Sequence, residues 1–454
     1  MIIMPFKLKL LNIFCFCFAA GIPFFDSFGI GGHRLGNLHQ ITVVVLALYL
    51  FLGTSFLKYN PWRSVKLTYV KYFLLFNAGI FASFLLSGSI TSLSVQHMTF
   101  YFELAFIYLL FSEVIFDSTT VRSFYYGLTL GLALSVFIGV MQFLKVPAFN
   151  LFKDDELNAN TSYVSEGDAV DVLRVWGPFG NALSFSFYIS VAGMLSFYFF
   201  HKVKKQKFIA WCVFAMSVLG ICLTISRMAL FAFVFCIALV YYLSVDRRRR
   251  ARFLAVVVVL TIVGALGLSA LTSEDPILSR FAASQDDFVT GRLALWEVGY
   301  KVWLNNLFFG TGPGNLNEQL YDNGWRIVGK DIIETTPGHV ENYYLTVLFT
   351  FGLVPFLIFA AYLTKLVQAC YRLLKAGLAD KNLADGIPLL GGVVCLLLNN
   401  LINPVMNSDI RIQLLMVLQM AICTGMYRKY STTPEYESTS GSSDLSLPKV
   451  WRHI

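Results

Sequence analysis

The sequence has little charge for a soluble protein. Charged residues make up 14% of the 454 residues, whereas a soluble globular chain carries roughly 25%. Hydrophobic residues reach 57% and include 43 Phe and 22 Tyr, more aromatic side chains than a water-soluble core of this size buries. This composition excludes a soluble enzyme, a disordered chain and a nucleic-acid-binding protein, so no nucleic acid is expected as a partner.

Familiar catalytic and metal-binding motifs are also missing. The chain has no GxxxxGK[ST] phosphate loop, no HExxH, no GxSxG and no paired carboxylate motif, which argues against an ATP-driven pump and a zinc protease. None of the eight cysteines falls in a predicted outer loop, so no structural disulfide is expected on the oxidising side. The sequence predicts no metal site and no cofactor.

Long apolar blocks are what the sequence has instead. A transmembrane helix needs about 20 mostly apolar residues, and twelve segments qualify. They cover roughly residues 9–29, 40–57, 70–88, 97–116, 123–144, 181–200, 208–225, 228–245, 253–272, 343–363, 387–405 and 412–427. We therefore expect an all-α polytopic membrane domain over residues 1–427, including long outer loops at 145–180 and 273–342, and a disordered cytoplasmic tail at 428–454.

Basic residues predict the orientation of these spans. Lys and Arg accumulate in cytoplasmic loops, and here they gather on alternate connections without a parity error. The basic side holds Lys7, Lys9, Lys58, Arg63, Lys66, Lys71, Arg122, Lys202, Lys204, Lys205, Lys207, Arg247 to Arg250, Arg252, Lys365, Arg372, Lys375, Lys381, Arg428 and Lys429. The short loops of the other side offer only Arg34 and Arg411. Both termini are therefore predicted to be cytoplasmic.

Two arginines stand out on the predicted outer side. Arg227 lies in a turn too short to leave the bilayer surface, where a guanidinium either snorkels into the interface or binds an anion such as phosphate. Arg292 follows a helix cap predicted at Thr290, so its charge would add to the free N–H groups of a first helical turn. A solvated surface arginine is the alternative for Arg292.

The residues after Arg292 predict an amphipathic helix. Its apolar side chains recur at helical spacing, which suits a helix lying on the membrane surface or one packed against its own loop. They are Leu293, Trp296, Tyr300 and Trp303.

Three further features have both a functional and an ordinary interpretation. The glycine-rich run at 310–315 either presents N–H groups to a phosphate or forms a plain turn. His339 and Glu341 precede the span that starts at 343 and are either proton acceptors or hydrogen-bonded loop residues. Glu103, inside a predicted span, is either a proton-coupling group or a partner in a helix–helix hydrogen bond.

The ordered set of these motifs resembles the bacterial O-antigen polymerase and ligase family. The matching residues are Ser226-Arg227, Thr290-Gly291-Arg292-Leu293, Trp296, Phe309-Gly310-Thr311-Gly312-Pro313-Gly314-Asn315, Asn342, Tyr344, Leu345 and Gly352-Leu353. These matches cover roughly residues 215–365. Further upstream, Arg174 and residues 177–181 are similar to the segment that precedes the corresponding earlier span in this family.

The resemblance implies a glycosyltransferase of the bacterial inner membrane, with its active site facing the periplasm. An acceptor sugar hydroxyl would attack the anomeric carbon of a polyprenyl-pyrophosphate-linked oligosaccharide, and polyprenyl pyrophosphate would leave. Arg227 and Arg292 would be catalytic and, together with Arg174, Gly312 and Gly314, would bind the pyrophosphate. The implied partners are the lipid-linked oligosaccharide, membrane lipid, a chain-length regulator and a flippase.

One departure from the family concerns the proton acceptor. The family usually has His directly followed by Asn, whereas here Glu341 precedes Asn342 and the histidine is His339, two residues earlier. An imidazole has an unperturbed pKa near 6.5 and a glutamate about 4.3, which favours His339 as the base. The departure favours an O-antigen or exopolysaccharide polymerase over an O-antigen ligase.

A lipid-linked oligosaccharide flippase is a further alternative, although it would not need a seventy-residue outer loop.

Overall fold

The structure is a computed structural model of the chain. It describes residues 3–25, 29–30, 33–34, 67–87, 90–114, 118–152, 163–166, 169–202, 204–245, 249–252, 286–327, 340, 342–401 and 409–431. The first half contains α1 (Ile3–Gly21), η1 (Ile22–Phe24), β1 (Gly29–Ile30), β2 (His33–Arg34), α4 (Thr68–Leu86), α5 (Ser92–Val114), α6 (Ser118–Phe143), η3 (Pro147–Phe152), β3 (Tyr163–Glu166), β4 (Ala169–Leu173) and η4 (Gly177–Phe179). The second half contains α7 (Ala182–His201), η5 (Lys204–Gln206), α8 (Lys207–Thr224), α9 (Arg227–Ser244), α12 (Asp286–Leu304), α13 (Leu316–Ile327), α15 (Tyr343–Phe351), α16 (Leu353–Ala379), η6 (Lys381–Gly386), α17 (Ile387–Asn399) and α19 (Ile410–Ser431).

Ten of the twelve predicted spans coincide with helices, and the other two, 40–57 and 253–272, lie outside the described residues. In the described part of the chain, eight helices are long and apolar enough to cross a membrane: α4, α5, α6, α7, α8, α9, α16 and α19. Two shorter apolar helices accompany them, at Leu11–Phe24 and Leu383–Asn399. The strands pair into two small antiparallel hairpins, β1–β2 and β3–β4. The prediction of an all-α polytopic membrane protein is confirmed.

Helix α7 is buried on every side. Almost all of its side chains are buried, and α6, α8, α9 and α17 pack around it. Small residues allow this close packing, because a Cβ added to Gly193 would collide with Ser217 of α8 and one added to Gly391 would collide with Met194. Close approach through Gly and Ser is typical of helix packing in membranes.

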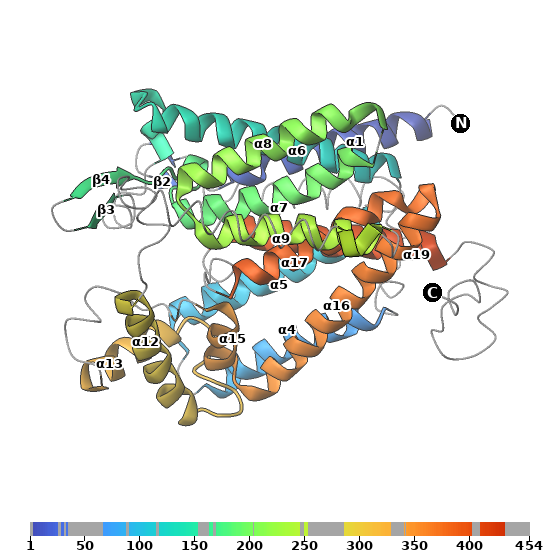
Figure 1. The fold of residues 1–454 in the computed structure, drawn as a ribbon. Helices are drawn as coiled ribbons and strands as arrows, with labels where there is room; N and C mark the ends of the chain where they lie inside the picture. Colours follow the sequence, from blue (N-terminus) through green and yellow to red (C-terminus); the bar gives the residue numbers. More distant parts are fainter. Residues whose placement is uncertain are drawn as a thin grey trace.

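An ion cluster around the buried carboxylate of Asp385 closes one end of the bundle, which we call the basic end. The Asp385 carboxylate of η6 pairs with the ammonium of Lys202 and lies 3.5 Å from Nε of Arg122. Burial lowers the pKa of Lys202, and the neighbouring carboxylate opposes that shift. The cluster fastens the start of α6 and the end of α7 to η6, close to the end of α16 (Figure 1).

The opposite end of the bundle, which we call the loop end, carries η4, the β3–β4 hairpin and the helices α12 and α13 (Figure 1). Here α12, α13 and α15 share a small apolar core, separate from the main one. Its fully buried side chains are Val298, Val302, Leu316, Leu320, Val340 and Phe349. The long segment 273–342 is therefore ordered where the structure describes it.

The predicted span 343–363 is divided into two helices. Gly352 separates α15 from α16 with φ 86° and ψ 179°, a conformation essentially restricted to glycine. Helix α16 then continues to Ala379, so Lys365, Arg372 and Lys375 lie on a helix rather than in the predicted loop. The sequence did not predict this break, because the residues on both sides of Gly352 are equally apolar.

Candidate active site

Two of the predicted arginines meet at the turn between α8 and α9. Ile225 adopts a left-handed conformation, with φ 54°, and allows α9 to begin at Arg227 directly after α8 ends. The Arg227 side chain is exposed. Arg174 reaches the same turn, because its Nε donates to the carbonyl of Thr224 at 3.1 Å. The structure therefore brings Arg174 and Arg227 to one corner of the loop end.

A mostly buried arginine, Arg411, stabilises this corner, with 11% of its side chain exposed. Arg411 forms a two-point ion pair with Asp409, at 2.8 Å for both N–O distances. The same guanidinium donates to the carbonyls of Pro178 and Phe179 at 3.3 and 3.0 Å, and it lies 4.3 Å from the centre of the Phe179 ring. Arg411 thereby ties the start of α19 to η4, which begins three residues after Arg174.

Helix α12 differs from its prediction at its start. It begins at Asp286, so Thr290 is not its cap and Arg292 lies in its second turn rather than its first. The expected combination of Arg292 with free N–H groups of a first turn is therefore wrong, because the helix extends upstream through two aspartates. The side chain of Arg292 lies outside the described part.

The predicted apolar stripe of α12 is only partly buried. Trp296 and Trp303 are half-buried, whereas Leu293 and Tyr300 are 54% and 50% exposed. The buried face runs through Val298 and its neighbours instead, and packs on α13 and α15. Helix α12 thus presents one apolar face to the protein and a second to its surroundings, which is compatible with a position at a membrane surface.

The glycine-rich run at 310–315 forms a brace around the break between α15 and α16. Four backbone hydrogen bonds pair the residues before and within this run with the end of α15 and the start of α16. They are Thr311 N to Phe349 O (3.1 Å), Gly312 N to Thr350 O (2.8 Å), Leu353 N to Leu307 O (2.9 Å) and Val354 N to Phe308 O (3.3 Å). The run thus satisfies backbone groups that the broken helix leaves open.

Gly312 and Gly314 both adopt positive φ, at 85° and 80°, and both lie against helix α4 or α5. Their fixed contacts give them a packing role. A phosphate-binding role for either glycine stays a prediction.

Asn342 fixes the start of α15. Its Oδ1 accepts from the backbone N–H groups of Tyr344 and Leu345 at 3.0 and 3.1 Å, the geometry of a helix cap. Its Nδ2 donates to the carbonyl of Leu401 at 2.9 Å, and Tyr343 N donates to the carbonyl of Asn400 at 3.0 Å. The capping asparagine thus binds the end of α17 as well as its own helix.

The end of α17 lies inside the bundle. Asn399, its last residue, donates from Nδ2 to Oγ of Ser190 at 3.1 Å. Ser190 is eight residues from the start of α7, or about 12 Å along the helix axis at 1.5 Å per residue. Asn342 is bonded to Leu401, two residues after Asn399, so the start of α15 is fixed to the end of α17.

His339 and Glu341 lie outside the described residues, and Val340 between them is described. The indole Nε1 of Trp296 donates to the Val340 carbonyl at 2.7 Å, which ties helix α12 to the segment that carries the two predicted proton acceptors. Arg292 stands one helical turn before Trp296 on the same helix. Glu103 lies on α5 and is half-buried.

Several residues of this site were not predicted as functional. Asp409, Arg411, Asn399 and Asn400 act through contacts with distant parts of the chain, so their local sequence carries no signal beyond polar residues at the ends of apolar runs. Among the described side chains, no group of three or more His, Cys, Asp and Glu is arranged to hold a metal ion.

These features define a polytopic membrane protein that carries Arg174 and Arg227 at one end of its bundle. Residues 211–360 match the model of a protein family described as O-antigen ligase, and no curated protein matches the chain. The match runs from α8 to α16 and contains Arg227, Arg292 and Asn342. It confirms, over this part of the chain, the resemblance to the O-antigen polymerase and ligase family found in the sequence.

Proposed function

We propose that this protein polymerises polyprenyl-pyrophosphate-linked oligosaccharide repeat units on the outer face of the bacterial inner membrane. The observation that carries the proposal is the coincidence of the family match with the loop end. The matched residues 211–360 contain the start of α9, helix α12, the glycine-rich brace and the start of α15. Contacts within the protein join α12, the brace and α15 to one another.

The proposed reaction is a glycosyl transfer without a metal. An acceptor sugar hydroxyl attacks the anomeric carbon, the bond from that carbon to the pyrophosphate oxygen breaks, and polyprenyl pyrophosphate leaves with the electron pair. The hydroxyl proton passes to a base of the protein. Two negative charges or more collect on the leaving group, so its stabilisation is the main task of the site.

Arg227 and Arg292 are proposed to stabilise the leaving pyrophosphate, with Arg174 assisting at the α8–α9 turn. Arg227 is the first residue of α9, where the helix dipole makes a positive side chain unfavourable. The dipole and the guanidinium together favour a bound anion. A preorganised donor of this kind contributes about 3–4 kcal/mol to transition-state stabilisation.

His339 is the proposed base, and Glu341 the residue that orients it or holds the arginines. Both precede the cap residue Asn342, which is bonded to α17 and to α15. A positioned general base contributes about 10²–10⁴-fold to the rate.

An O-antigen ligase is the second candidate, because the matching family carries that description. A ligase would use the same leaving group and transfer the finished glycan to lipid A-core or a protein acceptor. A lipid-linked oligosaccharide flippase is the third. The polymerase is favoured because the family's His-Asn pair is not kept here, with Glu341 in the place of the histidine.

The glycan profile of a deletion strain separates these functions. Loss of long chains with a single repeat unit still attached to the acceptor indicates a polymerase. Loss of every attached chain while lipid-linked polymer accumulates indicates a ligase, and accumulation of lipid-linked repeat units on the cytoplasmic side indicates a flippase. A chain-length regulator and a flippase are the protein partners we propose for the polymerase.

A further inference from the structure

The segment that leads from Arg174 to η4 is fixed to the end of α8. Nε of Arg174 donates to the Thr224 carbonyl at 3.1 Å. The next residue, Val175, donates from its backbone N–H to the Leu223 carbonyl at 3.2 Å. Val175 and Trp176, the two residues between Arg174 and η4, are both buried. A shift of η4 would therefore reach Arg174 through only two packed residues.

Two side chains from other helices hold η4 itself. Gln142 of α6 is buried; it accepts from the backbone N–H of Gly177 at 2.8 Å and donates to the carbonyl of the same residue at 3.0 Å. Arg411 of α19 donates to the next two carbonyls, those of Pro178 and Phe179. Every residue of η4 is thus bonded through its backbone to α6 or to α19.

Arg411 is itself held in one orientation. Four hydrogen bonds join its guanidinium to Asp409 and to η4, and such a planar group has five N–H donors in a fixed fork. A buried ion pair is often no more stabilising than apolar side chains of the same volume. Stability alone therefore does not account for a guanidinium and a carboxylate at this place.

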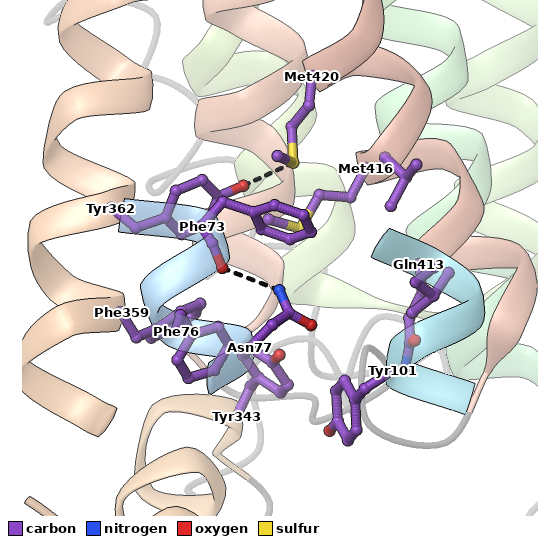
Figure 2. A pocket seen from close by; sticks show the side chains of 12 residues that line it. Phe73, Phe76, Asn77, Tyr101, Tyr343, Phe359, Tyr362, Gln413, Met416 and Met420 are labelled. Carbon is purple, nitrogen blue, oxygen red and sulfur yellow. Dashed lines mark hydrogen bonds between the residues drawn. The ribbon is translucent and has the colours of Figure 1, made fainter. Parts of the chain in front are cut away.

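The first turn of α19 has contacts on two sides. Arg411 and Gln413 are two residues apart, so their side chains point about 200° apart around a helix with 3.6 residues per turn. Gln413 lines a cavity of about 50 Å³ together with Tyr343, the first residue of α15, as Figure 2 shows. The turn thus contacts η4 on one side and the cavity beside the start of α15 on the other.

We propose that Arg411, fixed by Asp409, is a positioning residue: it holds η4 so that Arg174 keeps its place at the turn that carries Arg227. The inference rests on the proposed function, because that function gives Arg174 and Arg227 a leaving pyrophosphate to bind. Arg411 donates to a carboxylate and to backbone carbonyls of the protein. Its part is therefore to place another arginine, and the anion is bound by the arginine that it places.

The test measures binding of inorganic pyrophosphate to the purified full-length protein in nanodiscs, in buffer with a metal chelator. Arg411→Lys keeps the positive charge next to Asp409, but an ammonium lacks the planar fork that reaches a carboxylate and two carbonyls at once. We expect the affinity to fall about tenfold, the effect of losing one hydrogen bond to a charged group. Arg122→Lys makes the same change beside Asp385 at the basic end and should keep the wild-type affinity.

A double-mutant cycle shows whether Arg411 acts through Arg174. Arg174→Ala should weaken pyrophosphate binding by itself. Adding Arg411→Lys to Arg174→Ala should then weaken it by less than about twofold more, because the side chain that Arg411 positions is gone. A contribution to the general stability of the fold would instead lower the affinity by the same factor with and without Arg174.

Asp409→Asn combined with Arg411→Met decides the matter if Arg411→Lys does not fold. This double variant removes both charges, so no buried charge is left unpaired, and it loses the bonds to η4. Its affinity for pyrophosphate should fall at least as far as that of Arg411→Lys.

Wild-type affinity in either folded variant would overturn the inference, and so would an equal loss with and without Arg174. A wild-type protein that binds no inorganic pyrophosphate would overturn it as well. Failure of the proposed function appears separately, as a protein that shows the predicted coupling between Arg411 and Arg174 but forms no polymer.

Discussion

The two ends of the bundle use their arginines differently. At the basic end, Arg122 and Lys202 face the buried carboxylate of Asp385, so positive and negative charge meet within the protein. At the loop end, Arg174 donates to a carbonyl at the end of α8, and Arg227 occupies the first position of α9. A cation at a helix N-terminus is locally unfavourable. The comparison teaches that ion pairs brace both ends, through Asp385 at the basic end and through Asp409 with Arg411 at the loop end. Only the loop end also brings Arg174 and Arg227 to one turn, where we propose that they bind an anion.

The largest effects are expected from the loop-end arginines. Arg227→Ala and Arg292→Ala should each lower polymer formation at least 10²-fold, because each removes about 3–4 kcal/mol of stabilisation from the leaving pyrophosphate. Lys substitutions should rescue poorly, since an ammonium cannot form the two parallel bonds of a guanidinium. Glycan profiles of complemented deletion strains measure the effect, and immunoblots of membranes check that protein levels are unchanged.

Arg122→Ala is the matched control at the basic end. Its side chain is 56% exposed, and such an ion pair contributes about 0–1 kcal/mol, so polymer formation should stay within about twofold of wild type. Full activity of Arg227→Ala or Arg292→Ala would assign that arginine to the membrane interface. An Arg122→Ala protein that folds normally but makes no polymer would remove the distinction between the two ends.

The next largest effect concerns the proton acceptor before α15. His339→Ala should lose most activity, by about 10²–10⁴-fold, whereas Glu341→Gln should keep a measurable fraction. Initial rates of polymer formation in membranes that contain equal amounts of each variant measure both. Normal polymerisation by His339→Ala together with an inactive Glu341→Gln would exchange the two roles.

The break between α15 and α16 should be sensitive to a single methyl group. Gly352→Ala forces φ 86° on a residue with a Cβ and collides with the Phe308 carbonyl, at a cost of about 1–3 kcal/mol. Gly386 has φ −83° and its nearest neighbour would be 3.3 Å away, so Gly386→Ala should change stability by less than about 1 kcal/mol. Thermal unfolding of the purified variants measures the difference. Equal melting temperatures of Gly352→Ala and Gly386→Ala would contradict this prediction, because the residues around Gly352 would then accommodate the added methyl group without strain.

Reporter fusions test which side of the membrane each end of the bundle faces. They are expected to have the smallest effect on the protein, because no residue is substituted. Fusions after Lys207, Arg250 and Lys375 should report cytoplasm, because basic residues surround these positions. Fusions near Asn160 and Asn323 should report the outer side. If the fusions near Asn160 and Asn323 reported opposite sides, the two long loops would lie on different sides of the membrane. That result would contradict a single site at the loop end.

The helical spans were predictable because apolar composition alone identifies a segment long enough to cross a membrane. The break at Gly352 was not, since the residues on both sides are equally apolar and the cause is a contact with residues 307–312. The start of α12 was predicted five residues late: Thr290 suits a helix cap, which would make Gly291 the first helical residue, but the two aspartates at the observed start suit a first turn as well.

The site was predictable in part. Arg227 and Asn342 could be found because each lies next to the start of an apolar span, and a family resemblance marked both. Arg411 could not, because its role arises from carbonyls 232 and 233 residues away in sequence. The bond from Asn342 to Leu401 could likewise not be predicted, because no local pattern relates the end of α17 to α15.

The most direct test of the account is polymerisation by the purified protein. Full-length protein in nanodiscs would be given polyprenyl-pyrophosphate-linked single repeat units, extracted from the deletion strain, in buffer with a metal chelator. The account predicts a ladder of lipid-linked glycans with the wild-type protein and with Arg122→Ala, and no ladder with Arg227→Ala. A wild-type protein that forms no ladder, but transfers preformed polymer to a lipid A-core acceptor, would contradict it and identify a ligase.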